Sequence, residues 1–287
     1  MRKFGYVCLI GRPNVGKSTL TNQLLDTPIA IASDKPQTTW YEVKGLINHP
    51  KAQIMLSDTP GIHNMIHKKQ NQIMNRIAYS AVSSADIICH LVTATQYTEQ
   101  DAYVHAFLAP ISKHKILIIN QIDRFKPEQL FPYIAKMQEL GGYHSILSIS
   151  AKSGTNCDLL LEEIIESLPN KEPLYSKKHI HDHSVAFLAQ EMVREQLMQQ
   201  LQVEMPYTTH IEVFHTKQQE KCLEIHVNLH VKHIGQKKIL IGANGTKIKE
   251  IGQTARKRLQ VILKKRIMLR VWVKINPKIT GHNHLEH

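Results

Sequence analysis

The chain has 287 residues, 42% of them hydrophobic and 21% charged, which is typical of a globular protein with one large or two ordinary domains. This composition excludes collagen-like and disordered chains, and the apolar runs are far shorter than the roughly 20 residues that span a membrane. The net charge of +12 is uneven, because residues 1–170 hold 16 basic and 14 acidic residues, whereas residues 171–287 hold 20 and 10. We therefore expect a nearly neutral half and a half that meets a polyanion, unless the basic residues only form a solvated surface.

Four cysteines are spread along the chain without a C-x-x-C pair: Cys8, Cys89, Cys157 and Cys222. This spacing argues against zinc ligation and a disulfide framework, so we expect a reducing compartment, the cytoplasm. Cys8 and Cys89 lie inside apolar runs and are expected to fill the core. The apolar strand pattern begins at Phe4 and leaves no room for a signal peptide.

Up to residue 168, short apolar runs typical of strands alternate with amphipathic stretches typical of helices. The predicted strands are 4–10, 42–48, 53–57, 86–93, 115–120 and 145–149, and the predicted helices include 16–25, 68–83, 127–139 and 159–168. This alternation predicts an α/β domain over 1–168 with a mostly parallel six-stranded sheet and helices on both faces. The short connection at 48–50 makes strands 42–48 and 53–57 antiparallel neighbours.

A polar linker at 169–183 leads to a second domain at 184–276 and a tail at 277–287. The second domain is predicted to contain, in order, a helix at 184–202, strands near 208–215 and 221–232, helices at 235–241 and 246–263, and a strand at 267–275. This order is α-β-β-α-α-β. Histidines in the linker (His179, His181 and His183, with Asp182) could hold a metal, but their spacing fits no closed site and a plain linker is preferred.

Residues 11–18 fit the pattern G-x-x-x-x-G-K-[ST], and they follow an apolar strand and open a helix. Backbone N–H groups of such a loop cradle phosphates, Lys17 would bridge the β- and γ-phosphates, and the Ser18 hydroxyl would hold Mg²⁺. The expected nucleotide contacts in this segment are Gly11, Arg12, Pro13, Asn14, Val15, Gly16, Lys17, Ser18 and Thr19.

A second nucleotide segment, Asp58-Thr59-Pro60-Gly61, ends the predicted strand 53–57. Asp58 can orient Mg²⁺ through its water shell, and the Gly61 N–H can sense the γ-phosphate. Alone, this tetrapeptide could be an ordinary turn, but its place forty residues after a phosphate loop favours function.

Two further segments follow apolar strands and indicate the base: Asn120-Gln121-Ile122-Asp123 and Ser150-Ala151-Lys152. The Asp123 carboxylate can accept hydrogen bonds from the ring N–H and the amino group of guanine, an arrangement that adenine lacks. The Ala151 N–H would meet the guanine carbonyl oxygen. The alternative for Asp123 is a helix N-cap.

With these motifs the chain resembles the translation-factor-type GTPases, and among them the Era family, a GTPase domain followed by a KH domain. The segment Lys35-Pro36-Gln37-Thr38-Thr39 matches the switch segment of that family, where Thr39 would reach Mg²⁺ in the GTP state. Two positions depart from the family pattern. Gln121 stands where a lysine usually packs across the base, which predicts weaker nucleotide affinity, and Trp40 replaces an arginine and leaves the ordering of the switch open.

The C-terminal half carries the other part of this resemblance. Residues 232–274 hold thirteen Lys and Arg residues and the single acid Glu250, and they include the G-x-x-G sequence Gly242-Ala243-Asn244-Gly245. Such a loop in a type II KH domain clamps about four nucleotides of single-stranded RNA. The expected RNA contacts are Gly242, Ala243, Asn244, Gly245, Lys247 and Lys249, whereas Ile248, Ile251 and Leu259 are predicted to be helix core. Val193-Arg194-Glu195 and Glu204-Met205-Pro206-Tyr207 resemble family landmarks at the entrance to this domain.

The position that orients the attacking water in Ras-like enzymes holds Ile62, which cannot do so. The resemblance implies instead that Asn14 helps to hold K⁺ against the phosphates, so the expected catalytic residues are Lys17, Thr39, Gly61 and Asn14, with Ser18, Thr39 and Asp58 at Mg²⁺. Asn14 could alternatively only shape the loop. His63 is expected to face solvent and is not assigned a role.

These expectations describe a cytoplasmic GTPase that binds GTP or GDP, Mg²⁺ and single-stranded RNA. The resemblance implies that the RNA is the 3′ end of 16S rRNA, that the protein acts in maturation of the 30S ribosomal subunit, and that it associates peripherally with the inner membrane; we expect a monomer. Two other functions stay open: an RNA-binding scaffold that senses guanine nucleotides without useful hydrolysis, and a switch at the membrane surface.

Overall fold

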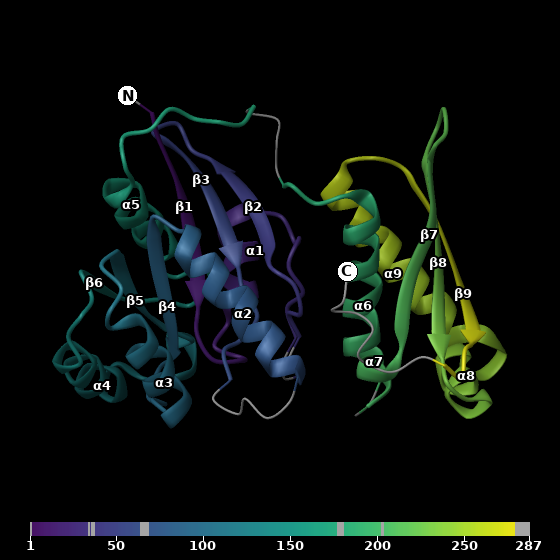
Figure 1. Cartoon of the computed structure of the whole chain (residues 1–287), viewed down its shortest axis with the longest axis horizontal. Coiled ribbons are helices and arrows are strands. Elements are labelled where there is room, and N and C mark those ends of the chain that lie inside the picture. Colours follow the sequence, from purple (N-terminus) through teal and green to yellow (C-terminus); the bar gives the residue numbers. More distant parts are fainter. Residues whose placement is uncertain are drawn as a thin grey trace. The chain divides into compact units, whose positions relative to one another are not determined.

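The computed structural model describes residues 2–33, 35, 38–63, 69–176, 181–201 and 204–278, with only the backbone of helix residues 69 and 70. Its contacts divide the chain into two compact units, Met1–Asp26 with Thr39–Asp182 and Thr27–Thr38 with His183–His287 (Figure 1). The division between Asp182 and His183 lies inside the predicted linker at 169–183. The grouping of the segment Thr27–Thr38 with the second unit was not predicted.

The first unit contains the six predicted strands. They are β1 (Lys3–Ile10), β2 (Val43–Asn48), β3 (Ala52–Asp58), β4 (Ile87–Thr93), β5 (His114–Asn120) and β6 (Ser145–Ser148), in the order β2-β3-β1-β4-β5-β6. All neighbouring pairs are parallel except β2 and β3, as expected from the short turn between them. Since β1 and β3 are parallel neighbours, the loops that follow them emerge at the same edge of the sheet.

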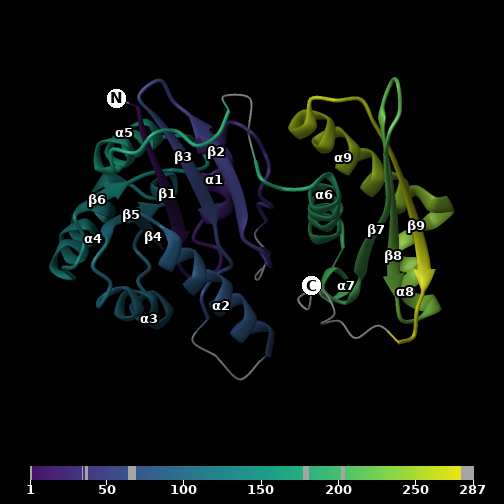
Figure 2. The same cartoon turned by 45° about the horizontal axis from the view of Figure 1, so that its top comes forward.

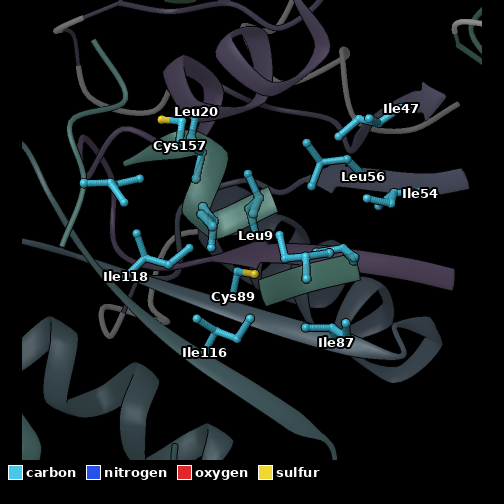
Figure 3. Packing of buried hydrophobic residues seen from close by; sticks show 14 of the residues in the cluster. Leu9, Leu20, Ile47, Ile54, Leu56, Ile87, Cys89, Ile116, Ile118 and Cys157 are labelled. Atoms are coloured by element: carbon cyan, nitrogen blue, oxygen red, sulfur yellow. The ribbon is translucent and has the colours of Figure 1, made fainter. Parts of the chain in front are cut away.

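Helices cover both faces of this sheet (Figures 1 and 2). Their bounds are α1 (Lys17–Leu25), α2 (Lys69–Ser84), α3 (Glu99–Leu108), α4 (Pro127–Glu139) and α5 (Cys157–Ser167). Side chains of α1 and α5 pack on one face, around Leu20 and Leu160, whereas α2 and α3 pack on the other, around Ala78 and Val104. Figure 3 shows the first of these cores, which includes Cys89.

Both cysteines that were predicted to fill the core are fully buried. Cys8 and Cys89 are each 0% exposed. Burial raises the pKa of both thiols, and it raises that of Cys89 to about 12, so neither is a reactive thiolate at neutral pH. These cysteines act as small apolar side chains.

The second unit has the predicted α-β-β-α-α-β order, with one additional short helix. Its elements are α6 (Val185–Gln200), α7 (Met205–Thr208), β7 (His210–Gln218), β8 (Leu223–Val231), α8 (Ile234–Ile241), α9 (Thr246–Leu263) and β9 (Ile267–Ile275). The sheet order is β7-β8-β9, with an antiparallel and then a parallel pair. Alternate residues of β8 are buried, and α6 and α9 contact the sheet on that side (Figures 1 and 2). In the described ranges of the chain, no helix is long and apolar enough to cross a membrane.

Candidate functional site

The phosphate loop lies between β1 and α1 and is held in shape by glycine. Gly16 precedes α1 with a φ of +97°, and a Cβ atom there would lie 2.2 Å from the Asn120 Nδ2 atom. Only glycine fits this position, because both its backbone conformation and its contact exclude a side chain. The loop therefore runs directly into the N-terminus of α1, where free N–H groups attract anions.

Lys17 curls back over the loop that was predicted to hold the phosphates. Its Nζ atom donates to the carbonyl oxygens of Gly11 at 3.1 Å and Arg12 at 3.0 Å. Burial lowers the pKa of Lys17 to about 8, so the amine stays mostly charged at neutral pH although burial disfavours the charge. A phosphate group would stabilise the charged amine, which is the role predicted for this residue.

Arg12 does not point into the loop. Its Nε atom donates to both carboxylate oxygens of Asp101, at 3.1 and 2.9 Å, and its Nη2 atom donates to the Thr93 hydroxyl at 3.1 Å. Asp101 is fully buried and also completes a capping box with Thr98 at the start of α3. If Arg12 contacts the nucleotide, it therefore does so with its backbone. Asp101 positions the Arg12 side chain and was not identified from the sequence.

The three residues predicted to hold Mg²⁺ come together. The Ser18 hydroxyl donates to Asp58 Oδ2 at 2.6 Å and lies 3.0 Å from the Thr39 hydroxyl. Asp58 is fully buried, and its second oxygen, Oδ1, has no hydrogen-bond partner. Burial raises the pKa of Asp58 to about 6. Two hydroxyls and a carboxylate with an unused oxygen are a donor set that suits a hard cation such as Mg²⁺.

The segment 58–61 lies directly against the phosphate loop. A Cβ atom on Gly61 would be 2.7 Å from the backbone nitrogen of Pro13, so only glycine allows this approach. The Ile62 N–H donates to the Gly11 carbonyl at 3.2 Å. In contrast, the Thr59 hydroxyl donates to the Leu9 carbonyl at 2.7 Å and is buried, so this predicted nucleotide residue anchors the loop with its side chain.

Two residues that follow this segment are held by the core. Ile62 is 0% exposed and packs with β1 and α2, which agrees with the expectation that it orients no water. His63 was expected to face solvent, and this prediction is wrong. Its backbone N–H and carbonyl both bind the buried Asn75 side chain, at 3.0 and 2.8 Å, and its Nε2 atom is buried without a partner. Burial also lowers the pKa of His63, so the ring is neutral near pH 7.

Asn120 joins the loops around the expected base site. Its Nδ2 atom donates to the Val15 carbonyl at 2.8 Å, and its Oδ1 atom accepts from the Ala151 N–H at 2.9 Å. In this structure the Ala151 N–H therefore donates to Asn120, and its expected contact with a guanine carbonyl stays a prediction. Asn120 is 1% exposed and acts as a brace between three loops.

Asp123 is exposed and aimed by a neighbouring loop. The Ser150 hydroxyl donates to Asp123 Oδ1 at 2.7 Å. Asp123 lies inside the short 3-10 turn Ile122–Arg124, whereas the N-cap of α4 is Lys126. This placement excludes the N-cap alternative. Ile122 packs its side chain on the core near β5, and Lys152 is exposed.

Gln121 spans the distance between the base loop and the phosphate loop. It has a φ of +67°, its Nε2 atom donates to the Asn14 carbonyl at 3.1 Å, and its Oε1 atom accepts from Arg124 at 2.8 Å. Gln121 thus lies along one edge of the site. In the family pattern, a lysine at this position would pack across the base. Asn14 is exposed with a φ of +63°, which fits the loop-shaping alternative.

The switch segment is held at both of its described ends. Trp40 is 2% exposed and anchors the chain after Thr39 in the core. Before it, the Arg194 guanidinium of α6 donates to the Thr38 carbonyl and the Lys35 amine donates to the Leu201 carbonyl. Arg194 is itself paired with Glu191 at 2.5 Å and is 2% exposed. Pro36 and Gln37 lie outside the described residues, as does His179 of the linker.

The predicted RNA loop connects α8 to α9 in the second unit. Gly242 and Gly245 have φ values of +72° and +75°, and Ala243 and Asn244 are exposed between them. A hollow of about 240 Å³ opens beside the first turns of α9. It is lined by Ile248, Lys249, Gly252, Gln253, Arg256, Leu269 and Val271.

The core prediction for α9 holds for two of its three residues. Ile251 and Leu259 are fully buried, but Ile248 is partly exposed and lines the hollow. Ile248 therefore belongs to the candidate RNA surface. Ile248 lies four residues, about one helical turn, before Gly252, so both are on the same face of α9. This spacing could have identified Ile248 from the sequence.

Comparisons with known proteins agree with this geometry. Residues 6–121 match the family model described as 50S ribosome-binding GTPase, and residues 204–278 match the family model described as KH domain. GTPase Era of Pseudomonas aeruginosa strain LESB58 is 39% identical over 94% of this chain and 89% of its own length. GTPase Era of Pseudomonas entomophila is also 39% identical, over 94% of this chain and 91% of its own length.

Two solved structures share the whole fold. A crystal structure of Era in complex with MgGDPNP and nucleotides 1506–1542 of 16S ribosomal RNA is 35% identical, with a TM-score of 0.91 and coverage of 99% of this chain and 97% of that one. A variant of Aquifex aeolicus Era bound to GDP and AlF₄⁻ is 34% identical, with a TM-score of 0.90 and the same coverage. With a phosphate loop, a Mg²⁺ donor set and a KH loop in their expected places, the chain belongs to the Era family of GTPases.

Proposed function

We propose that this GTPase is a switch that binds the 3′ end of 16S rRNA through its KH domain and acts in the maturation of the 30S ribosomal subunit. The observation that carries the nucleotide part is the meeting of Ser18, Thr39 and Asp58 beside Lys17. The RNA part is supported by the G-x-x-G loop and its hollow, and by the complex of a 35% identical relative with 16S ribosomal RNA.

At the phosphate end of the site, the chain supplies the Lys17 amine, backbone N–H donors, and the oxygen atoms that would hold Mg²⁺. Lys17 would leave the Gly11 and Arg12 carbonyls and donate to phosphate oxygens. Mg²⁺ supplies charge neutralisation when bound, held by Ser18, Thr39 and Asp58. The Gly61 N–H would donate to a γ-phosphate and thereby distinguish GTP from GDP, which is supported by the close approach of Gly61 to Pro13 of the phosphate loop.

At the base end, discrimination depends on one carboxylate. Ser150 holds one oxygen of Asp123, so the carboxylate is oriented before guanine arrives. An adenine base would leave this charge without its two donors, which costs several powers of ten in affinity. We expect GTP and GDP to compete with each other and ATP not to compete.

For the chemical step we propose assistance by K⁺ near Asn14. The proposal is supported by the fully buried and apolar Ile62, which cannot orient water at the position that does so in Ras-like enzymes. Phosphate release in KCl should exceed release in NaCl at the same ionic strength. Equal rates in the two salts would contradict the proposed role of K⁺.

The RNA part is tested by binding of an oligonucleotide with the 16S rRNA 3′ sequence. Ala243→Asp with Asn244→Asp puts two carboxylates where phosphates are expected, and should weaken binding by at least about tenfold because the loop then repels the RNA backbone. Gln218→Asp with Gln219→Asp adds the same charge at another exposed site of the domain and serves as the control. Equal affinity of the two double variants would contradict the assignment of the loop.

The place of action is part of the same proposal. We propose that the protein works in the cytoplasm and associates peripherally with the inner membrane, which is supported by the excess of basic residues in 171–287. Sedimentation with anionic vesicles should then be lost in high salt. Vesicle binding that is stronger than RNA binding would favour the membrane-surface switch instead.

A further inference from the structure

The sheet of the second unit has one face that no described helix covers. Strand residues alternate between faces, and on β8 the inward residues Ile225, Val227 and Leu229 are fully buried. On the opposite face, two large aromatic side chains are exposed, Phe214 at 48% and Trp272 at 40%. Large exposed aromatic groups on one surface are unfavourable in water unless they serve binding.

These aromatic residues form a cluster with a histidine. The ring centres of Phe214 and Trp272 are 5.7 Å apart, and His226 lies 5.7 Å from Phe214 and 5.1 Å from Trp272. The register between β7 and β8 shifts between Val213 and His215, so Phe214 is the extra residue of a bulge. A bulge re-aims a side chain, and here it brings Phe214 into the cluster.

The charges around the cluster favour an anionic ligand. The Lys274 amine lies 5.5 Å from the centre of the Phe214 ring. The two acids of this face are both engaged by histidines, Glu212 with His230 at 2.8 Å and Glu224 with His226 at 2.7 Å. Arg270 is exposed on the same face, 4.0 Å from Glu224. Cations beside exposed rings are the combination that binds single-stranded nucleic acid, through phosphate contacts and base stacking.

Strand β9 connects this face to the hollow beside the G-x-x-G loop. Leu269 and Val271 line the hollow, and Arg270 and Trp272 alternate with them and therefore point to the open face. β9 is the last strand of the sheet. An RNA strand that leaves the hollow around this edge meets Trp272 on the other side.

We propose that Phe214, His226 and Trp272 form a second RNA subsite, on which unpaired bases next to those held by the KH loop stack. The proposal rests on the proposed RNA binding and extends it. It assigns the open face to nucleotides of a continuous single strand, with the phosphates beside Lys274 and Arg270.

The test compares five- and twelve-nucleotide oligocytidines with the full chain. The KH loop holds about four nucleotides, so only the longer oligonucleotide can reach the open face. Trp272→Ala should weaken binding of the twelve-nucleotide RNA by about fivefold or more, since one stacked base contributes roughly that much, and should leave the five-nucleotide RNA unchanged. Trp272→Phe should retain most of the affinity. Val261→Ala, which removes an apolar side chain that is 58% exposed on α9, should have no effect.

Tryptophan fluorescence gives a second readout, because the chain has only two tryptophans and Trp40 is 2% exposed. The longer RNA should quench the emission of Trp272. In the Ala243→Asp, Asn244→Asp variant the five-nucleotide RNA should no longer bind, and the longer RNA should still quench weakly.

Several results would overturn the subsite. Unchanged binding of both oligonucleotides by Trp272→Ala contradicts it while leaving the KH proposal intact, and equal losses for both show a general defect in place of a subsite. Failure of the wild-type chain to bind the twelve-nucleotide RNA removes the subsite, whereas the KH proposal is removed by failure to bind the 16S rRNA 3′ sequence. A dimer in sedimentation velocity that Trp272→Ala abolishes assigns the face to a second copy of this chain.

Discussion

Asp58 combines a buried position with the proposed role of a Mg²⁺ ligand. It is 0% exposed, one oxygen accepts from Ser18 and the other has no partner, and burial raises its pKa to about 6. Without a cation, burial makes the charged carboxylate costly. The structure thus keeps a donor that is unfavourable alone and becomes stable when Mg²⁺ provides the missing charge.

This raised pKa predicts how nucleotide binding depends on pH. As the pH falls through about 6, Asp58 is protonated and the Mg²⁺-dependent part of the GDP affinity should disappear, whereas affinity in EDTA should change little. Titrations of fluorescent GDP between pH 5 and 8, with and without Mg²⁺, measure this difference. A Mg²⁺ effect that persists unchanged at pH 5 would contradict the role of Asp58.

The stability of the metal-free protein should depend on pH in the opposite direction to the Mg²⁺-dependent GDP affinity, and should fall as the pH rises. Between pH 3.8, the ordinary pKa of an aspartate, and about pH 6, the folded state keeps a proton on Asp58 that the unfolded state has lost. The contribution of this group to stability therefore falls as the pH rises through that window. The full effect is about 3 kcal/mol at most. Asp58→Asn removes the titrating group. The free energy of unfolding of this variant, measured in urea, should therefore fall less between pH 3.8 and about 6 than that of the wild type.

Gln121 gives a second prediction at the scale of one residue. Its amide reaches the Asn14 carbonyl from a backbone with a φ of +67°. Gln121→Lys should bind GDP several-fold more tightly, because the longer apolar stem covers more of the base and the amine can still reach Asn14. Calorimetric titration with GDP measures the change, and Gln129→Lys on the exposed start of α4 is the control. Equal or weaker affinity would show that glutamine causes no loss here.

At the scale of elements, the N-terminus of α3 positions the phosphate loop. Asp101 is fully buried, caps α3 and holds Arg12 in an ion pair of 2.9 Å. Asp101→Ala should reduce the free energy of unfolding by roughly 3 kcal/mol, because it breaks a buried pair and a cap, and should also weaken GDP binding. Chemical unfolding and GDP titration measure both effects.

The control for this prediction is Asp158→Ala. Asp158 is also in the first turn of a helix, α5, but it is exposed. It should change stability by less than about 1 kcal/mol and leave GDP binding unchanged. Loss of stability by Asp101→Ala with GDP affinity intact would mean that α3 does not position the loop.

Elements were easier to predict from the sequence than the contacts between them. Strands β1 to β5 are rich in apolar residues, since both faces of the sheet are covered, and their predicted ends differ from the observed ends by at most one residue. Helix α3 was given no bounds from the sequence, although Thr98 and Asp101 form a capping box, and α7, which was not predicted, is only four residues long. Short helices with little apolar periodicity lack the pattern on which prediction depends.

The candidate site shows the same contrast. Motif spacing predicted that Ser18 and Asp58 would meet, since they follow the parallel strands β1 and β3, and the family resemblance added Thr39 to them. It did not predict that Asn120 would brace Val15 and Ala151, or that Asp101 would hold Arg12. Such contacts join residues far apart in sequence and depend on side-chain directions that spacing alone does not determine.

At the scale of the whole molecule, two adjacent residues belong to different units. Thr38 is held by Arg194 within the second unit, and Thr39 is a candidate Mg²⁺ ligand in the first. We therefore predict that a change at Thr39 between the GTP and GDP states is transmitted through the backbone to Thr38 and α6. If it is, thermodynamic linkage requires nucleotide and RNA to change each other's affinity by the same factor.

Arg194→Met with Glu191→Gln tests this link. The second change avoids a buried carboxylate without its partner. The ratio of RNA affinities in the presence of a GTP analogue and of GDP should approach one in this variant, because Thr38 is released from α6. Fluorescence anisotropy measures the ratio, with the exposed Arg76→Met of α2 as the control. A ratio equal to that of the wild type would place the coupling elsewhere.

The most direct test of the central claim is phosphate release from GTP in KCl and Mg²⁺, with RNA of the 16S rRNA 3′ sequence present. Lys17→Ala supplies the blank, since it removes the amine that covers the phosphate loop. The account predicts turnover clearly above that blank and a loss of about a hundredfold or more in Asp58→Asn, because charge neutralisation at the phosphates is a large part of catalysis. No turnover above the blank by folded, RNA-bound protein would contradict it and favour an RNA-binding scaffold that only senses guanine nucleotides.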